Sequence, residues 1–341
     1  MTKWLIENKE RTDIYMKKRK YRIIIVPITI ISLFLGGFYY FIQPKHQVVL
    51  EMNDTSQSHE PQSEEKQVIQ DQRRQISLIS VGNSDLYSGL NPMQLWHDYG
   101  ITAFNISAAK QNMKLSYYMF KYALMVQKPK CLLLEVDQFF EDREEIEPEG
   151  YEYTALAYCY PLFKNSDKWD KIKNEKFVKK EESTHRLNYL GFYDSREVKK
   201  YKGGFHYMKK TQKREKLPRL TQKYLPQILS LAKENNCEVL FVEFPSQTSW
   251  NYQRYNTVYD IAKQHHIPYI DFNVNQYDTG FDWKTDSRDG GNHLNYYGAT
   301  KMTKFIGEYL KEHYTIEDDR KHIEYQDYQK IYEKYQQNFM S

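Results

Sequence analysis

The feature that most constrains the fold of this chain is a series of short apolar runs that alternate with longer amphipathic stretches. The runs are rich in β-branched and aromatic residues, as buried strands are. They occupy residues 76–81, 103–106, 131–136, 238–244 and 269–272. Candidate helices follow the later runs at 114–126, 217–235, 255–265 and 298–313. Because each run is continuously apolar, helices should cover both faces of the sheet. The sequence therefore predicts an α/β fold around a five-stranded parallel sheet.

A second feature is the stretch 23–42, which contains no charged side chain over 20 residues. As a helix it would be about 30 Å long, the thickness of a bilayer core. Residues 1–22 before it contain eight Lys or Arg and three acids, a net charge of +5. The positive-inside rule keeps this basic tail cytoplasmic and places the rest of the chain outside the cell. We expect a single-pass protein of the cell membrane. A cleaved signal peptide is the competing interpretation, but the run is long for one and no small-residue cleavage site follows it.

The rest of the chain, from residue 43 onward, falls into segments of different composition. Residues 43–75 are polar and poor in aromatics, as expected of an extracellular stalk. The folded α/β domain is predicted at 76–313, with a long insertion at 137–216, and a charged, aromatic tail at 314–341. The chain has three Cys, and two of them, Cys131 and Cys237, begin apolar runs. They are interpreted as buried thiols, and a disulfide between them is the alternative that sequence leaves open.

Polar residues follow the first apolar run, in the sequence Gly82-Asn83-Ser84-Asp85. Ligands of parallel α/β sheets bind at the carboxyl ends of the strands, where this turn should lie. A serine at the start of a helix there could act as a nucleophile, with backbone N–H groups aimed at a developing oxyanion. The same four residues are also ordinary composition for a turn with a helix cap.

Before the last predicted helix, Asp289 lies four positions ahead of His293 on a Gly-rich loop. A serine hydroxyl needs a base, and the imidazole needs an acceptor on its other nitrogen. Ser84, His293 and Asp289 could supply these three roles, because both loops belong at the same edge of the sheet. Asp286 is a second candidate for the acid. The alternative is that His293 is an ordinary surface loop residue.

The Gly-x-Ser turn, the Asp…His-Leu-Asn-x-x-Gly block and the five expected strands together resemble the SGNH/GDSL hydrolase superfamily. More narrowly, the chain resembles its membrane-anchored DltD-like and alginate-acetylation-like branch, which works beside membrane-bound O-acyltransferases. The resemblance implies an SGNH-like, flavodoxin-like fold in which Ser84 is the nucleophile, His293 the base and Asp289 its acid. The third block reads Glu-Val-Asp-Gln at 135–138 where Gly-x-Asn-Asp would be expected, so the usual side-chain oxyanion donor is absent. Asn105, Gln111 and Gly82 are the candidates for oxyanion or substrate binding, whereas an ionised Asp137 would repel an oxyanion.

This resemblance implies a membrane-anchored acyltransferase that places an acetyl or D-alanyl group on a cell-envelope glycopolymer. Its partner would be a membrane-bound O-acyltransferase. An esterase, and a non-catalytic polymer-binding module, are the alternatives. Residues 164–216 of the insertion carry 17 Lys or Arg against 8 acids, which suits an anionic polymer such as teichoic acid, although a solvated helix face would look the same. The external location disfavours nucleic acid. No cofactor motif and no metal-ligand spacing is present.

Overall fold

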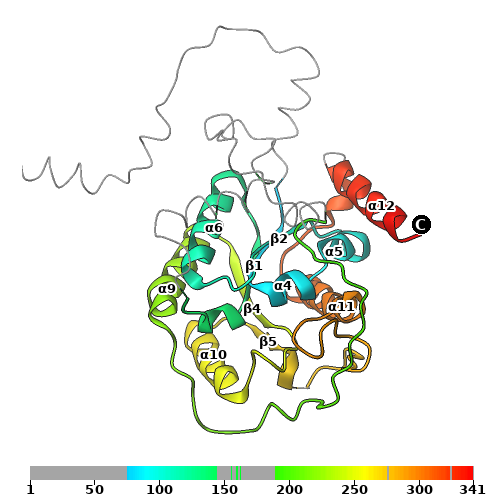
Figure 1. Ribbon diagram of the computed structural model, residues 1–341. Coiled ribbons are helices and arrows are strands. Elements are labelled where there is room, and N and C mark those ends of the chain that lie inside the picture. The colour runs from blue at the N-terminus through cyan, green and yellow to red at the C-terminus, as the bar shows by residue number, and fades with distance from the viewer. Residues whose placement is uncertain are drawn as a thin grey trace, which may run out of the picture. The chain divides into compact units, whose positions relative to one another are not determined.

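The computed structural model describes residues 75–143, 189–274, 276–322 and 325–340, together with Ala155, Cys159 and Leu162 (Figure 1). The predicted cytoplasmic tail, membrane helix and all but the last residue of the stalk lie outside these residues, as does much of the insertion. Within the described part of the chain, no helix has the length and apolar character needed to cross a bilayer.

Five parallel strands form one sheet in the order β2-β1-β3-β4-β5. Their bounds are β1 Leu78–Gly82, β2 Ala103–Ser107, β3 Cys131–Glu135, β4 Glu238–Glu243 and β5 Tyr269–Asp271. Each lies within two residues of a predicted strand at either end, so the predicted five-stranded parallel sheet is confirmed. The strand order changes direction between β1 and β3, and the crevice at such a point is where α/β folds bind ligands.

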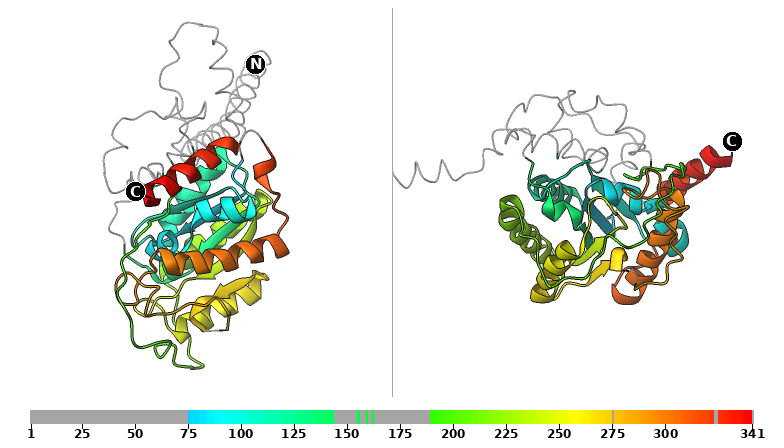
Figure 2. Two further views of the ribbon diagram at one scale, coloured as in Figure 1. Left: turned by 90° about the vertical axis from the view of Figure 1, so that its right-hand side faces the viewer. Right: turned by 60° about the horizontal axis from the view of Figure 1, so that its bottom comes forward.

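Helices cover both faces of the sheet, as Figure 2 shows. One face packs against α6 (Met113–Val126), α9 (Arg219–Glu234) and α10 (Tyr252–His265). The other packs against α4 (Ser84–Gly89) and α11 (Tyr296–His313), with α5 (Pro92–Tyr99) contributing to both layers. Successive residues of β1 show the division, since Leu78 belongs to one apolar cluster and Ile79 to the other. This double burial explains why the strands are apolar throughout.

Asparagine side chains begin most of these helices by accepting hydrogen bonds from first-turn N–H groups. The caps are Asn83 for α4, Asn91 for α5, Asn112 for α6, Asn251 for α10 and Asn295 for α11. The two short helices α4 and α5 were not among the predicted ones. Six and eight residues are too few to show a clear helical period, and such helices depend on caps and tertiary packing.

The C-terminal tail forms helix α12 (Gln326–Met340), which lies beside α5 (Figure 1). The rings of Trp96 and Tyr328 are 5.4 Å apart, and the Tyr328 hydroxyl reaches the carbonyl of Ala103 on edge strand β2. Leu190 accepts a hydrogen bond from the backbone of Asn105 on the same strand. Tail and insertion thus cover the exposed edge of β2, a device that prevents further strand pairing.

All three cysteines are buried and free. Cys131 and Cys237 are therefore separate thiols, and the disulfide that the sequence left open between them is not formed. Burial raises the pKa of both thiols, which keeps them protonated and unreactive.

The described C-terminal part of the insertion runs along the carboxyl edge of the sheet. We call residues 199–216 the basic strap. Backbone hydrogen bonds join Lys199 to Ser287 and Tyr201 to Trp283, so the strap follows the loop that carries His293. Its aromatic rings turn inward and pack on Trp283, while its lysines stay exposed. The exposed lysines are Lys199, Lys200, Lys202, Lys209, Lys210, Lys213 and Lys216.

A candidate active site at the carboxyl edge of the sheet

Ser84 lies at the first position of α4, immediately after β1. Asn83 caps this helix, and its side-chain oxygen accepts the N–H of Asp85 at 2.8 Å. Gly82 ends the strand where no side chain fits, because a Cβ there would lie 2.6 Å from the Glu135 Cβ. The turn that presents Ser84 therefore requires a glycine for close approach and an asparagine for capping.

The same turn is held by the carboxyl end of β3. Glu135 accepts the Asn83 N–H at 2.9 Å, and Asp137 accepts the Asn83 side-chain amide at 2.7 Å. Asp137 also forms an ion pair with Arg254 at 2.9 Å, which compensates its charge. The departure from the family pattern at 135–138 thus has a structural role: these carboxyl groups hold the turn from behind.

His293 and Asp289 are in direct contact. The Nδ1 atom of His293 lies 2.5 Å from Oδ2 of Asp289. The other carboxylate oxygen accepts the backbone N–H groups of His293, at 2.8 Å, and of Asn292, at 3.1 Å. Burial raises the pKa of Asp289, but these hydrogen bonds and the nearby positive charge outweigh it and lower the pKa to about 2. An ionised Asp289 favours a proton on Nδ1, which leaves Nε2 free to act as a base.

Asp286, the second candidate for the acid, lies elsewhere. Its carboxylate is fully buried and forms an ion pair with Lys301 at 2.7 Å. It also accepts hydrogen bonds from the Asp282 N–H and the Thr285 hydroxyl. Of the two acids, Asp289 is the one that contacts the imidazole.

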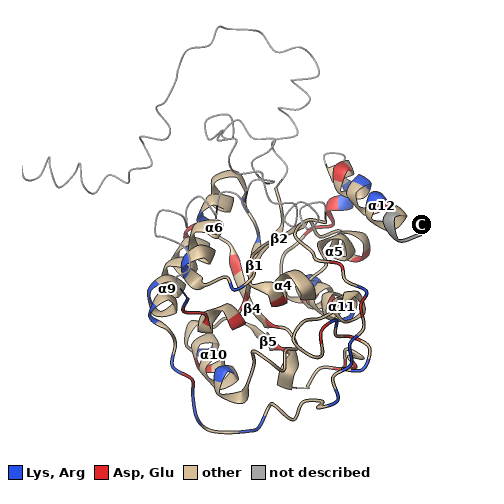
Figure 3. Cartoon of the chain, in the orientation of Figure 1, with Lys and Arg blue, Asp and Glu red and all other residues tan. Residues whose placement is uncertain are grey.

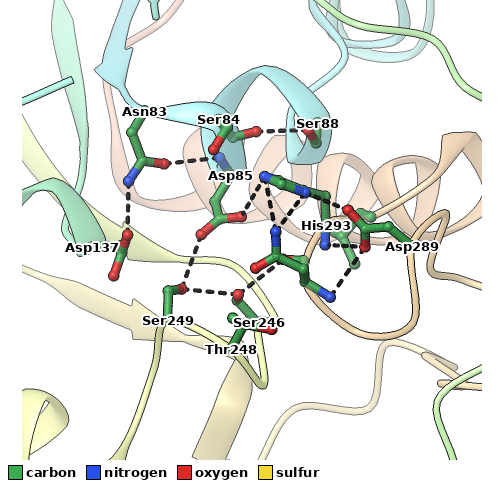
Figure 4. A network of polar contacts seen from close by, with 12 residues as sticks. Asn83, Ser84, Asp85, Ser88, Asp137, Ser246, Thr248, Ser249, Asp289 and His293 are labelled. Carbon is green, nitrogen blue, oxygen red and sulfur yellow. Dashed lines mark hydrogen bonds and ion pairs between the residues drawn. The ribbon is translucent and has the colours of Figure 1, made fainter. Parts of the chain in front are cut away.

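Ser84 and His293 meet at the same edge of the sheet, with Asp85 between them (Figure 4). The Nε2 atom of His293 lies 3.9 Å from Oδ1 of Asp85. Among the described residues, none forms a hydrogen bond with the Ser84 hydroxyl. The backbone carbonyl of Ser84 accepts a hydrogen bond from the Ser88 hydroxyl at 2.6 Å. The geometry therefore joins the acid to the histidine directly and brings the histidine to the residue next to Ser84.

Asp85 is almost completely buried, and sequence reasoning gave it no role. Its carboxyl group lies 3.3 Å from the Ser249 hydroxyl. The Ser249 hydroxyl in turn lies 2.8 Å from the Ser246 hydroxyl. Ser246 donates to the backbone carbonyl of Asn292, beside the histidine. Burial raises the pKa of Asp85, and the negative charges of Asp137 and Glu135 raise it further. The raised pKa favours the neutral form of Asp85 beside Nε2 of His293.

Arg288 is a further residue that the sequence did not single out. Its guanidinium donates to the Ser88 hydroxyl at 2.8 Å and lies over the ring of Tyr193, 4.8 Å from the centroid. It thereby connects the loop that carries Asp289 to helix α4. Its position directly before Asp289 was the available signal, but a sequence cannot show which helix an arginine reaches.

The three candidate oxyanion residues have other contacts. The Asn105 side chain donates to the Leu90 carbonyl at 2.8 Å, and that of Gln111 donates to the Ser116 hydroxyl at 2.7 Å. Both side chains are buried, and each uses one of its N–H donors within the fold. Gly82 contributes the close approach described above. The Ser84 N–H, at the start of α4, has no hydrogen-bond partner among the described residues and remains the available donor.

The described residues contain no group of three His, Cys, Asp or Glu side chains arranged to hold a metal ion.

No family model matches this chain, and no curated protein matches it. Several solved structures are similar at low identity. One is a protein assigned to the G-D-S-L lipolytic family from Desulfitobacterium hafniense, with a TM-score of 0.37 and 12% identity over 68% of this chain and 98% of that one. Another is a GDSL-like lipase from Bacteroides thetaiotaomicron, with a TM-score of 0.33 and 11% identity over 75% and 92%. A third, assigned as an acylhydrolase, comes from Bacteroides fragilis, with a TM-score of 0.35 and 10% identity over 80% and 96%. Two of these three structures are thus described as GDSL-like lipolytic proteins and the third as an acylhydrolase. The likeness is distant, so the function proposed below rests on the contacts of the site.

Proposed function

We propose that this chain is a serine enzyme that cleaves a carboxylic ester and forms an acyl-enzyme on Ser84. His293 takes the proton from the Ser84 hydroxyl, and Asp289 orients the imidazole and stabilises its cation. The observation that carries this proposal is the 2.5 Å contact between Asp289 and Nδ1 of His293, on a loop that faces the Ser84 turn. An isolated surface histidine would have no such carboxylate held against its ring nitrogen.

Reaction requires the Ser84 hydroxyl to turn toward Nε2 of His293. In the structure Nε2 faces the neighbouring Asp85, at 3.9 Å. Catalytic hydrogen bonds are often loose without substrate and tighten when it binds. A substrate carbonyl placed above the start of α4 would accept a hydrogen bond from the Ser84 N–H. This bond would stabilise the oxyanion of the tetrahedral intermediate. The imidazolium would then return its proton to the leaving group.

We further propose that the acyl group is transferred to a hydroxyl of an anionic cell-envelope polymer. The donor would be a membrane-bound O-acyltransferase, and the uncharged run at 23–42 would anchor this chain beside it with the N-terminus cytoplasmic. The support is the basic strap, whose exposed lysines follow the loop that carries Asp289 and His293. A row of exposed positive charges attracts a polyanion and raises its local concentration.

The first test is labelling of the purified full-length chain with a fluorophosphonate probe. Wild type should be labelled, whereas Ser84→Ala should not, and His293→Ala, which removes the base itself, should react at least roughly ten-thousandfold more slowly. Ser230→Ala, which removes an exposed serine on α9, is the matched control and should label like wild type. Equal labelling of Ser84→Ala and wild type would exclude Ser84 as the nucleophile.

The second test separates acyl transfer from its alternatives in the source cell. Envelope polymers of a Ser84→Ala strain should lose acyl esters if the enzyme transfers acyl groups to them. A gain of esters would instead identify an esterase, in which water takes the place of the polymer hydroxyl. Full function of the Ser84→Ala chain in a deletion strain would favour a non-catalytic polymer-binding module.

The third test concerns the basic strap alone. A Lys199→Ala, Lys202→Ala double variant should bind teichoic acid several-fold more weakly at low salt, and the difference should shrink as salt is added. Its reaction with the fluorophosphonate probe should not change. A Lys223→Ala, Lys233→Ala double variant, which removes two exposed lysines on α9, controls for net charge. Unchanged polymer binding by the double variant would remove the strap from the proposal.

A further inference from the structure

Arg288 is a largely buried cation beside the candidate site that has no part in the proposed proton transfers. Its side chain is 13% exposed, and its Nε atom lies 4.0 Å from Oδ2 of Asp289. Figure 3 shows acidic residues gathered around the ends of the central strands, whereas Lys and Arg lie mainly on outer helices and loops. Removing a guanidinium from water is costly unless hydrogen bonds and nearby charges compensate it. A largely buried arginine at this place is therefore a candidate for a role in the site.

On one side, Arg288 is fixed to the loop that carries the histidine. Its backbone N–H donates to the carbonyl oxygen of His293 at 3.2 Å. Its Nη1 atom donates to the carbonyl oxygen of Leu294, the next residue, at 3.3 Å. An antiparallel bridge between Ser287 and Leu294 closes the loop at the same point. The base and the arginine thus belong to one small hydrogen-bonded unit.

On the other side, Arg288 reaches the nucleophile through one hydroxyl group. Its Nη1 atom also donates to Oγ of Ser88 at 2.8 Å, although the two residues are 200 positions apart. The Ser88 hydroxyl donates its own hydrogen to the backbone carbonyl of Ser84 at 2.6 Å, a contact that Figure 4 shows. A hydroxyl can donate and accept at the same time, so both bonds form together. Ser88 is 1% exposed, which limits competition from water.

The charged partner distinguishes Ser88 from an ordinary helical serine. A serine in a helix can donate to the carbonyl four residues earlier, and that contact alone would be local. Hydrogen bonds to a guanidinium are roughly twice as strong as those between neutral groups. The guanidinium also lies 4.8 Å from the ring centroid of Tyr193, whose backbone N–H donates to the carbonyl of Tyr87 on α4 at 2.8 Å. Arg288 is thus held against α4 by two contacts of different kinds.

We propose that Arg288 is a positioning residue that, through Ser88, sets the distance between the base and the nucleophile. The connection runs from the His293 carbonyl through Arg288 and Ser88 to the Ser84 carbonyl, and we call it the arginine bridge. It joins the two parts of the site, which are far apart in the sequence. Arg288 acts through Ser88 and exchanges no proton itself. The catalytic effect of the bridge rests on the proposed role of Ser84, whereas its existence does not.

Loss of the arginine bridge should misplace the base without unfolding the site. A second connection joins the same two parts, from Asp85 through Ser249 and Ser246 to the carbonyl of Asn292. This connection should keep the loop near the turn. A displacement of about 1 Å at a reacting group can slow a reaction about a hundredfold. The rate of reaction should therefore fall much more than the stability of the fold.

Substitution of either side chain of the bridge should slow labelling of Ser84 in the full-length chain. Arg288→Met keeps most of the apolar stem over Tyr193 but removes the donors, whereas Ser88→Ala removes the shared hydroxyl and keeps the charge. Each should react with the fluorophosphonate probe about tenfold to a hundredfold more slowly, the range for a lost hydrogen bond to a charged group. The loss should appear in the maximal rate of labelling rather than in the probe concentration that gives half of it. Because Ser88→Ala is the smaller change, it decides the test even if Arg288→Met does not fold: a wild-type rate in Ser88→Ala would overturn the positioning role.

Arg320→Met is the matched control. Arg320 also joins a loop to a helix, since it pairs with Asp318 at 2.7 Å and donates to the carbonyl of His97 on α5. Asp319, the residue before it, accepts the Thr102 hydroxyl just ahead of β2, so these contacts lie at the opposite edge of the sheet. This variant should lower the thermal unfolding midpoint slightly and label like wild type. Slower labelling in the control would show that a general loss of stability slows the reaction, and it would count against positioning.

Arg288→Lys separates the bridge from packing. Its ammonium group keeps a donor for Ser88, so this variant should react faster than Arg288→Met at a similar thermal unfolding midpoint. The advantage should vanish when Ser88→Ala is also present, because the acceptor is then gone. An equal advantage of lysine over methionine in both backgrounds would mean that only the charge matters, and it would overturn the bridge.

Unfolding in urea tests the bridge without any assay of activity. If Arg288 and Ser88 act as one unit, the double variant Arg288→Met, Ser88→Ala should lower the unfolding midpoint by less than the sum of the two single effects. Additive effects would mean that the two side chains are independent, and they would overturn the bridge. Labelling of Ser84→Ala like wild type, together with non-additive unfolding, would instead refute the proposed function and leave the bridge standing.

Discussion

The Ser84 turn and the Asp289–His293 loop differ in the origin of their hydrogen bonds. Asn83, in the turn, is held by Glu135 and Asp137, which lie more than 50 positions away along the chain. In the loop, by contrast, Asp289 accepts the N–H groups of residues three and four positions ahead, as well as the imidazole. One half of the candidate site is fixed by the sheet beneath it, and the other largely by its own sequence.

This difference has a consequence for substitution. Changes within the loop should affect chemistry with little effect on the fold, since the contacts that are lost are local and partly exposed. Changes at the turn should reduce the stability of the fold and displace Ser84 together, because the contacts there are buried and join separate strands.

The largest expected effect comes from Asp289→Asn, which breaks the loop pair and leaves the turn intact. The amide can donate to Nδ1 and so favours the wrong tautomer of His293. We expect a loss of roughly ten-thousandfold in the rate of ester cleavage or fluorophosphonate labelling, with an almost unchanged thermal unfolding midpoint. Asp286→Asn is the comparison, since that carboxylate contacts Lys301 and not the imidazole. A larger loss of activity in Asp286→Asn would reverse the assignment of the acid.

Gly82→Ala should have the next largest effect, and it acts on the turn alone. The added Cβ would meet the Glu135 Cβ at 2.6 Å and the Leu86 Cβ at 2.8 Å, both in well-packed positions. We expect a decrease of about 1–3 kcal/mol in the free energy of unfolding, measured with urea. Gly280→Ala, where a Cβ would meet nothing, is the matched control for space, although its positive φ adds a small strain of its own. Equal effects at the two glycines would show that the turn is not tightly packed.

Asn83→Ala removes the helix cap and the hydrogen bond to Asp137 but keeps the backbone contact to Glu135. A lost N-cap costs about 1 kcal/mol of stability. Asn251→Ala, which removes the cap of α10, should have a similar effect on stability without slowing the fluorophosphonate reaction. A slower reaction in Asn83→Ala alone would show that the cap positions Ser84, whereas equal reactivity of the two variants would show that the backbone contact suffices.

The smallest expected effect is the contribution of Asp289 to stability in acid. Its pKa is lowered from 3.8 to about 2, so the carboxylate stabilises the fold above pH 3.8 and loses this contribution as the pH falls toward 2. The side chain is one-third exposed, which limits the effect to less than about 1 kcal/mol. Urea unfolding at several values of pH should show wild type and Asp289→Asn converging in acid. A difference that persists at the lowest pH would mean that the stabilisation does not depend on the charge of Asp289.

The strands could be predicted closely because a fully buried strand leaves a continuous apolar run in the sequence. The helices α6, α9, α10 and α11 were found from their periodic pattern, with starts that differ by up to three residues where an asparagine cap sets the true beginning. The short helices α4 and α5 carried too few residues for that signal. The inward packing of the aromatic rings of the basic strap was also beyond sequence, because their partner Trp283 lies far along the chain.

For the candidate site, the sequence alone was enough to predict which loops follow the strands and that Asp289 lies four residues before His293. These are local quantities, and a parallel sheet brings such loops to one edge whatever the details of packing. Only the folded structure shows that Asp289 rather than Asp286 meets the imidazole, that Asp85 lies beside Nε2, and that the side-chain amides of Asn105 and Gln111 each donate a hydrogen bond within the fold. Contacts between distant strands depend on which side chains share a dry interior, and a linear pattern of residue types does not contain that information.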